Sequence, residues 1–325
     1  MPVLFAACSL LVGPSDLISA RHIWGWLIEG IFQGGLIQSY DRELIEVVVL
    51  NTRLPRIILA LLIGASLTAS GTTLQALFRN PLVSPDILGL SSGAAFGAAL
   101  AYVIPSLPVQ PMAFFFGLVA AGLTYFLAVK KREVSTVSLI LSGVIVSAIF
   151  TALLTILQFL SDPFKLQTIV HWTMGNLHNA SWSKVRSSAM LILMGCVWLF
   201  VIRWRMNVIA LGEEETRVVG LSPRREKLLL LIPATLIASA SVAVSGIIGM
   251  VGLAVPHMVR LMVGPDNTRT IPVSFAFGGS FLLVVDTLSR TLSSFEIPVG
   301  IFTTLIGGPF FVLLLKRARF LPMSG

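Results

Sequence analysis

The chain has 325 residues, of which 55% are hydrophobic and only 12% are charged. A soluble domain carries about one quarter charged residues, so this composition and the mean hydropathy of +0.90 exclude a soluble globular protein and predict an integral membrane protein. The net charge of +8 comes from cations that are spread between apolar runs instead of being clustered in one polar domain, so we expect no nucleic-acid partner.

The first apolar run extends from Met1 to about Gly13, lacks the basic start of a signal peptide, and is shorter than the roughly 20 residues of a full crossing. The run from Leu228 to Val263 is too long for one helix and has small residues, Ser245 to Gly252, near its middle, which predicts two helices joined by a tight turn. The other runs are each long enough, or nearly so, to cross a bilayer: 57–77, 87–104, 112–129, 137–160, 187–204, 271–288 and 299–315. We therefore predict an all-α protein of about ten transmembrane helices, with residues 1–325 forming one domain.

Ten crossings place both termini on the same side, and the distribution of cations predicts which side. With the termini inside, the cytoplasmic connections hold 15 of the 23 Lys and Arg residues, so the positive-inside rule favours cytoplasmic termini. The long connections 14–52 and 161–186 then face the periplasm, and the tryptophans in them suit a membrane interface. The largest polar insertion on the cytoplasmic side is 203–227, where we expect a soluble partner to bind.

Ionisable residues are scarce within the predicted spans: Asp286 and Arg290, four residues apart, stand out. Ion-coupled carriers usually hold their coupling ion with buried carboxylates or interrupted helices, so a secondary carrier would have to rely on Asp286. The chain also contains no Gly-Lys pair and therefore no phosphate-binding P-loop. If it transports, we expect the energy to come from an ATPase on a separate chain.

Ordered motifs along nearly the whole chain resemble those of permease subunits in binding-protein-dependent ABC importers of the iron-siderophore, haem and vitamin B12 type (FecCD-type, type II importers). The matching residues are Arg53-Leu54-Pro55-Arg56, Gly71, Gln75, Arg79-Asn80-Pro81-Leu82, Pro85, Leu88-Gly89, Gly93-Ala94, Trp172, Gly175, Asn207, Ala210-Leu211-Gly212-Glu213, Ser245-Gly246, Gly249, Gly252, Pro256-His257, Arg260, Pro298, Gly300, Gly308 and Pro309.

This resemblance implies a transport subunit, not an enzyme, in a bacterial inner membrane. It implies a homodimer with two ABC ATPase subunits and one periplasmic substrate-binding protein. ATP and Mg would then be bound by the partner ATPase, with no cofactor in this chain. The implied cargo is a metal chelate, either a ferric siderophore, haem or cobalamin, and a metal oxyanion such as molybdate stays open.

Arg53 and Arg56 flank Pro55 just before the second apolar run, so both guanidiniums could project from the outer lip. Ordinary interfacial anchoring is one interpretation. The resemblance implies that these arginines and Arg290 receive acidic residues of the binding protein, because guanidinium–carboxylate pairs steer and orient a transient complex. Asp286, one turn before Arg290, could instead neutralise it.

The segment 207–220 resembles the cytoplasmic coupling helices of the family, which insert into a cleft of the ATPase. Its three consecutive glutamates also suit a solvated loop, or the start of a helix, where acidic side chains complement the helix dipole. The residues implied in coupling are Asn207, Ala210, Leu211, Gly212, Glu213, Glu214, Arg217 and Gly220.

The resemblance also places a cytoplasmic gate at Ser135, Thr136, Val137 and Ser138, directly after the basic residues 130–132. Short side chains at a constriction could close it across a two-fold axis and open it by small tilts of the helices. The simpler interpretation is that these residues only begin a helix.

Two further readings of short motifs carry less weight. The residues 89–93 fit the Gly-x-Ser-x-Gly pattern of serine hydrolases, and with His257 as a base they would suggest an intramembrane serine protease. Gly93 and Gly97, like Gly64 and Thr68, also have the small-xxx-small spacing of closely packed membrane helices, which is the commoner explanation. The four histidines are scattered in sequence without ligand spacing, and we expect no stable metal site.

Overall fold

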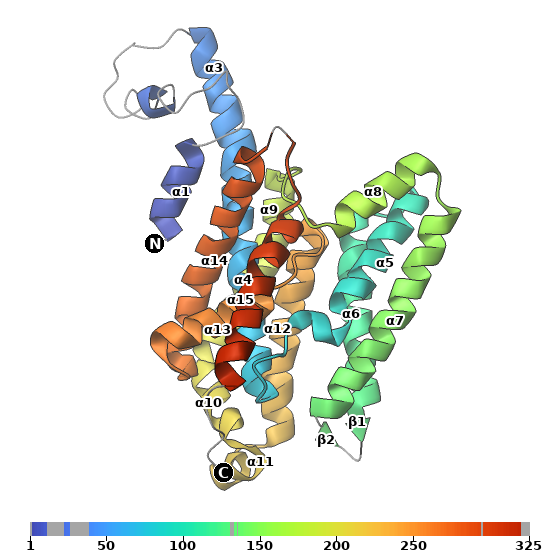
Figure 1. Ribbon diagram of the computed structural model, residues 1–325, viewed down its shortest axis with the longest axis vertical. Coiled ribbons are helices and arrows are strands. Elements are labelled where there is room, and N and C mark those ends of the chain that lie inside the picture. The colour runs from blue at the N-terminus through green and yellow to red at the C-terminus, as the bar shows by residue number, and fades with distance from the viewer. Residues whose placement is uncertain are drawn as a thin grey trace.

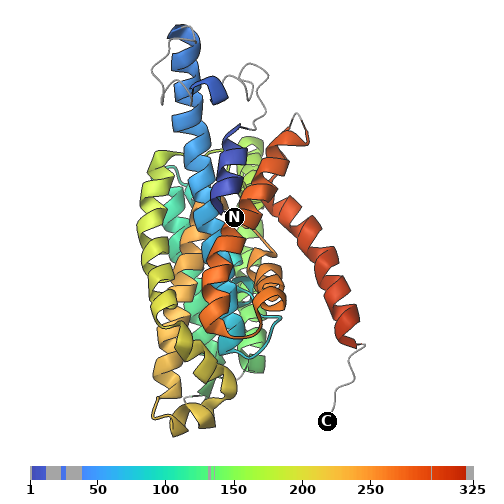
Figure 2. The same cartoon turned by 90° about the vertical axis from the view of Figure 1, so that its left-hand side faces the viewer.

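The computed structural model of the protein describes residues 2–11, 23–26, 39–130, 133–134, 136–293 and 295–319. They form an elongated bundle of helices with α3 at one end and α11 at the other (Figures 1 and 2). The helices are α1 (Pro2–Leu11), α3 (Ser39–Val47), the π-helical η1 (Val48–Arg53), α4 (Leu54–Leu77), the 3₁₀ turn η2 (Pro85–Leu88), α5 (Leu90–Val103), α6 (Val109–Ala128), α7 (Thr136–Leu160), α8 (Pro163–Thr173), α9 (Trp182–Val201), α10 (Arg203–Leu211), α11 (Glu213–Val218), α12 (Pro223–Ser245), α13 (Val251–Val263), α14 (Asn267–Thr291) and α15 (Val299–Arg319). The two-residue strands β1 (Val129–Lys130) and β2 (Glu133–Val134) pair antiparallel between α6 and α7.

Within the described residues, six helices are long and apolar enough to cross a membrane, and four shorter helices are also apolar. The protein is therefore a multi-span helical membrane protein, as its composition predicted. The predicted division of the run 228–263 is confirmed, since α12 ends at Ser245 and α13 begins at Val251. Gly246 has a φ of +72° at this break, a conformation that glycine adopts without steric cost.

The segment before α4 differs from its predicted form. Residues 39–52 belong to the connection 14–52 that was expected to face the periplasm, and the span was expected to begin at Ile57. Helices α3 and η1 instead continue directly into α4, so that Glu43–Leu77 is one apolar helical stretch. Figure 1 shows α3 extending this stretch beyond the ends of the neighbouring helices. The remainder of the predicted connection 14–52 lies outside the described residues, except 23–26.

The span expected to begin at Ile87 also starts differently. The chain leaves α4 through a short loop and forms the 3₁₀ turn η2, and α5 begins only at Leu90 because Gly89, with a φ of +72°, separates the two elements. Figure 1 shows η2 at about half the height of the bundle, between α12 and α7. The half-buried Asp86 of this turn accepts a hydrogen bond from the Ser91 hydroxyl of α5.

The centre of the bundle is α4, whose side chains are mostly buried against α14, α12 and α13. A Cβ atom at Gly64 would lie 2.2 Å from the carbonyl oxygen of Gly278 in α14, and one at Gly71 would lie 1.9 Å from that of Gly252 in α13. Glycine therefore permits the backbones to touch, which maximises van der Waals contact where lipid supplies no hydrophobic driving force. Thr68 also faces Gly278, so the predicted role of the Gly64 and Thr68 spacing in helix packing is confirmed.

Gly93 and Gly97 of α5 behave in the same way. Added Cβ atoms would lie 2.4 Å from the carbonyl oxygen of Phe116 and 2.3 Å from that of Met112, both in α6. The second small-residue motif is thus also a packing surface.

Hydroxyl groups supply the polar contacts between α4 and its neighbours. Ser70 donates to the carbonyl oxygen of Ala234 in α12 at 2.8 Å, and the hydroxyls of Thr72 and Ser274 in α14 are 2.9 Å apart. All of these side chains are buried or held in helix interfaces, where no water competes for the bond. Direct backbone contact and interhelical hydrogen bonds together join α4 to α12, α13 and α14.

The contact at Gly71 gives a matched test. We expect Gly71→Ala to lower the free energy of unfolding by about 2 kcal/mol or more, because the added methyl group meets backbone atoms that cannot rotate away. Gly122→Ala in α6 is the control, since no atom lies within 4 Å of its added Cβ. Thermal unfolding of the purified protein in detergent should show a lower Tm for Gly71→Ala alone, and equal Tm values for the two variants would contradict the assigned contact.

Candidate functional site

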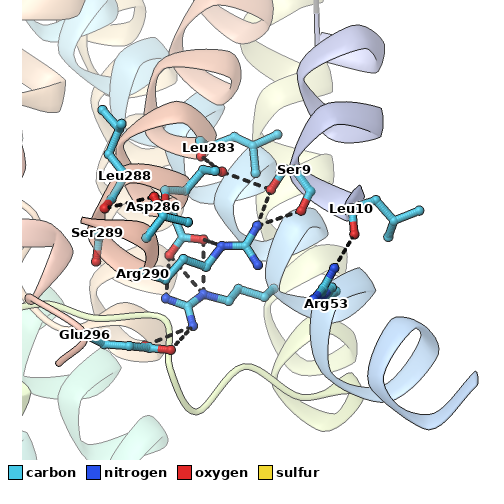
Figure 3. Close-up of polar contacts among 12 residues, drawn as sticks. Ser9, Leu10, Arg53, Leu283, Asp286, Leu288, Ser289, Arg290 and Glu296 are labelled. Carbon is cyan, nitrogen blue, oxygen red and sulfur yellow. Dashed lines mark hydrogen bonds and ion pairs between the residues drawn. The ribbon is translucent and has the colours of Figure 1, made fainter. Parts of the chain in front are cut away.

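Buried charge is concentrated near the α3 end of the bundle, where α1, α4 and α14 meet (Figure 3). We call Arg53, Arg56, Asp286, Arg290 and Glu296 the arginine cluster. Arg53 ends η1, Arg56 lies in the first turn of α4, and Asp286 and Arg290 lie on α14. The first four side chains are buried, so each charge must find its partner within the protein.

Arg56 is at the centre of this cluster. Its Nε lies 3.0 Å and 3.1 Å from the two carboxylate oxygens of Asp286, and its Nη2 lies 2.9 Å from Oδ1. Its Nη1 lies 3.0 Å from both carboxylate oxygens of Glu296. The guanidinium thus bridges two carboxylates, one fully buried and one whose side chain is 37% exposed. Such charge-assisted, multidentate pairs are stronger than neutral hydrogen bonds.

Arg53 and Arg290 both bind the last turn of α1. Arg290 Nη2 lies 2.7 Å from the carbonyl oxygen and 2.7 Å from the hydroxyl of Ser9, and Arg53 Nη1 lies 2.7 Å from the carbonyl oxygen of Leu10. The last carbonyl groups of a helix have no partners within it and carry partial negative charge. The two arginines therefore satisfy the carboxyl end of α1 and hold it against α4 and α14.

The structure corrects the expected placement of these arginines. Arg53 and Arg56 were expected to project from the outer lip, yet they are only 4% and 7% exposed, because the helix continues beyond them and they face α1 and α14. The alternative that Asp286 neutralises Arg290 is met only by a long ion pair, with 4.0 Å between Arg290 Nε and Asp286 Oδ2, and the shorter contacts of Asp286 go to Arg56. The role of the three arginines in docking stays a prediction.

Sequence reasoning missed Glu296 and Ser9 as members of this site. Glu296 could have been suspected because it is the only acidic residue after Asp286. Nothing in the local sequence of Ser9 indicates that it accepts from an arginine 281 residues away. The expectation that the spans carry few charges besides Asp286 and Arg290 was also incomplete, because Arg56 is buried beside them.

The predicted coupling segment lies at the opposite end of the bundle, where α10 and α11 form a helical corner (Figure 1). Gly212 joins them with a φ of +150°, and its carbonyl oxygen accepts from the backbone N–H of Thr216 at 3.1 Å. The corner exposes apolar side chains, with Leu211 66% and Val218 87% exposed. Ala210, Glu214, Arg217 and Gly220 are exposed around them, whereas Glu213 is half-buried.

Buried and polar contacts anchor this corner to the bundle. Asn207 donates to Asp266 Oδ1 at 2.6 Å and accepts from the backbone N–H of Asn267 at 2.8 Å, which ties α10 to the first turn of α14. Hydrogen bonds from Asn207 and Thr268 lower the pKa of Asp266, so its carboxylate stays charged as the cap of α14. Lys227 pairs with Glu213 at the start of α11. The segment is therefore a fixed part of the structure and not a loose loop.

The predicted gate falls at the start of α7, directly after the β1–β2 hairpin. Ser135 lies outside the described residues, and Thr136 is the first residue of α7. Val137 is 66% exposed and Ser138 is half-buried. The hairpin fixes where α7 begins, but the gate itself stays a prediction.

The structure does not favour the hydrolase interpretation. Ser91 donates to Asp86, and Ser92 donates to the carbonyl oxygen of Gly89 at 2.9 Å. Within the described residues, neither hydroxyl is hydrogen-bonded to His257. The carrier interpretation depended on Asp286, whose carboxylate is occupied by Arg56.

Two of the histidines that looked scattered in the sequence are neighbours in the structure. The imidazole rings of His171 and His178 have centroids 4.8 Å apart. Among the described residues, no group of three or more His, Cys, Asp or Glu side chains could hold a metal ion.

The two carboxylate partners of Arg56 should contribute unequally to stability. We expect Asp286→Asn to lower the free energy of unfolding by about 3–5 kcal/mol, because it leaves a buried guanidinium without its main counter-charge. Glu296→Gln should cost about 1 kcal/mol or less, since this partner is partly exposed to water. Thermal unfolding in detergent compares the two, and an equal or larger loss in Glu296→Gln would show that Asp286 is not the principal partner.

Comparison with known proteins places the whole chain in one family. Residues 2–317 match the model of the FecCD transport family. The chain is 43% identical over 277 residues to the cobalamin import system permease protein of Halobacterium salinarum, which covers 84% of this chain and 74% of the relative. It is 38% identical over 317 residues to a permease protein of an iron chelatin transport system in Helicobacter pylori, and this match covers 98% of this chain and 96% of the relative.

A solved structure of a metal-chelate type ABC transporter in an inward-facing conformation superposes with a TM-score of 0.83 at 33% identity, covering 97% of this chain and 96% of the other. The match to the family model, the sequence relatives and the superposed fold all extend over most of the chain. This protein therefore belongs to the FecCD transport family of membrane permeases.

Proposed function

We propose that the chain is the membrane-spanning subunit of an ATP-driven importer for a metal chelate in a bacterial inner membrane. Two copies would enclose one translocation path, with two ABC ATPase subunits on the α11 side and a periplasmic binding protein on the α3 side. The observation that carries the proposal is the coupling segment. It is an anchored helical corner that presents exposed Leu211 and Val218 at one end of the bundle.

The chemistry of this corner suits a soluble partner. Exposed apolar side chains beside charged ones are typical of a protein interface, where a few buried anchors supply most of the binding energy. The chain has no P-loop of its own, so ATP and Mg would be held by the ATPase bound at this corner. The segment 203–227 then faces the cytoplasm, and with ten crossings both termini lie on that side.

Helix α14 offers a direct mechanical route from the ATPase to the binding protein. Its first turn is hydrogen-bonded to Asn207 of the coupling segment, and its last turns carry Asp286 and Arg290 of the arginine cluster. A helix that moves as a rigid body would convert a displacement of α10 and α11 into a displacement at the other end. Closure of the ATPase would thereby alter the site at which the binding protein docks.

The arginine cluster would receive the binding protein by exchange of partners. Acidic side chains on that protein could replace the partly exposed Glu296 at Arg56, while the buried Asp286 stays in place. Arg53 and Arg290 would contribute positive potential and fix the end of α1. Docking would then require small movements of the loop that carries Glu296.

Helix α7 is the part of the chain best placed to line the path. One of its faces stays exposed along the length of the helix, from Val137 at 66% through Val144 at 61% to Phe159 at 87%. In a homodimer, two such faces could enclose an apolar path with the gate residues 135–138 at its inner end. An apolar wall would let a bulky chelate pass without binding it tightly.

The proposed contact with an ATPase is tested by charging the exposed corner. The test variant carries both Leu211→Glu and Val218→Glu. On co-purification in mild detergent, we expect the amount of ATPase recovered with it to fall at least about tenfold below that of the unmodified protein, because apolar anchors of an interface contribute about 1–2 kcal/mol each to binding. Subunit counting and ATP hydrolysis on the isolated complex provide the measurement, with one ATPase per permease chain expected for the unmodified protein.

Phe164→Glu is the matched control, because Phe164 is 82% exposed on α8, far from this corner. It should retain the ATPase. Equal retention by the double variant and the unmodified protein would show that the corner is not the contact. Transport by a purified complex that lacks any ATPase would overturn the importer proposal.

A further inference from the structure

Two polar cavities lie near the α3 end of the bundle, and only the one lined by Arg56 and Glu296 adjoins the docking site proposed above. One has a volume of about 390 Å³ and lies between α5, α8 and the loop before α9, and the other, of about 340 Å³, lies beside the arginine cluster. Both are lined by His171, Asn176 and His178, so these three side chains stand between the cavities. They come from the end of α8 and the loop that follows it.

The two imidazole rings have the separation of adjacent ligands on one metal ion. Their centroids are 4.8 Å apart and their planes are inclined at 80°. With a metal–nitrogen distance of about 2.1 Å, each ring centroid lies about 3.3 Å from the metal, so adjacent ligands at a right angle have centroids about 4.7 Å apart and opposite ligands about 6.6 Å apart. The observed distance fits the adjacent arrangement.

Both rings are exposed to the cavities and chemically able to bind a metal. The Asn176 side-chain amide lies 3.4 Å from Nδ1 of His171 and donates to the His171 carbonyl oxygen at 3.1 Å, which orients this ring. A metal at Nε2 requires the tautomer with its proton on Nδ1, so binding would turn the amide oxygen of Asn176 toward that nitrogen. Only the neutral imidazole offers a lone pair to a metal.

We infer that His171 and His178 form a transit site for a chelated transition-metal ion that has two adjacent coordination positions open. A resident metal site normally supplies three or four protein ligands, and no third His, Cys, Asp or Glu side chain completes this one among the described residues. A cargo whose remaining positions are filled by its own chelator needs no third ligand. Two protein ligands also bind the chelated metal ion weakly enough for it to dissociate and continue along the path.

The cavity wall complements the chelator as well as the metal. Lys184, Gln110, Gln167 and Asn179 line the larger cavity, and their ammonium and amide groups donate hydrogen bonds to oxygen atoms. They suit an anionic, oxygen-rich chelator better than a bare cation, which Lys184 would repel. Imidazole in turn prefers borderline ions such as those of copper, nickel, zinc and ferrous iron.

This inference deepens the proposed function, on which it rests, by naming the class of cargo. It favours chelates with three or four donor atoms, which leave adjacent positions open. A hexadentate chelate or an oxyanion offers no open position, and a planar macrocycle leaves opposite positions, which the 4.8 Å separation does not match.

The nickel complex of nitrilotriacetate is the direct probe, because its tetradentate anionic chelator leaves two adjacent positions open. Binding to the isolated permease, purified without a polyhistidine tag, is measured by calorimetry and by the visible absorption of nickel. We expect one complex per chain, with affinity at least about tenfold lower in His171→Gln and in His178→Gln, because each substitution removes one of two cooperating ligands. His257→Gln, on α13, is the control and should bind like the unmodified protein.

Nickel bound by EDTA, which fills every position, should not bind. The inference would be overturned if His171→Gln and His178→Gln bound the nitrilotriacetate complex as tightly as the unmodified protein. It would also be overturned if His257→Gln weakened binding by the same factor, or if the EDTA complex bound as tightly as the nitrilotriacetate complex. The measurement needs no ATPase. A permease that retains its ATPase but does not bind the nickel complex therefore contradicts this inference alone, and one that binds nickel but retains no ATPase contradicts the proposed function alone.

Discussion

The buried ion pair between Arg56 and Asp286 is the contact on which the α3 end of the molecule depends. Removing two charges from water costs several kcal/mol for each ion, and only close geometry with further hydrogen bonds offsets that cost. Here Arg56 reaches both oxygens of Asp286 and also Glu296. The pair also fixes the position of α14 relative to α4, so that Arg290 and Arg53 can meet the last carbonyl groups of α1.

Helices α4 and α14 also stay in contact along much of their length, for a different physical reason. Glycine at Gly64 and Gly278 brings the backbones together, and the Thr72–Ser274 hydroxyl contact lies further toward the α11 end. Because lipid offers no partners for polar groups, these contacts must be complete within the protein. Helices α4 and α14 are therefore firmly joined. Helix α14 in turn connects the coupling segment, at its first turn, to the arginine cluster, near its last turn.

The two ends of the molecule differ in how they expose their chemistry. At the α11 end, apolar side chains project from a corner whose base is held by hydrogen bonds. At the α3 end, the arginines of the arginine cluster are buried and mostly paired, while imidazole and amide groups line the cavities. A stable contact with a permanent partner suits the first arrangement, whereas brief contacts with a docking protein and a passing cargo suit the second.

The sequence by itself determined the membrane class, the apolar segments and the break between α12 and α13, because composition, apolar length and glycine placement are local properties of the chain. It also indicated the small-residue packing at Gly64 and Gly93 and the polar insertion that forms α10 and α11. Together with the ordered motifs, these features identified the family.

Only the tertiary structure decided which charges are buried and which side chains meet. Arg56 and Asp286 are 230 residues apart, and whether an arginine at a helix start faces water or protein depends on the helix that continues before it and on those packed beside it. His171 and His178 are close in sequence, but the end of α8 and the turn at Gly175 bring their rings together. Which side chains pair with each other depends on how the helices pack, so no local sequence pattern encodes the pairing.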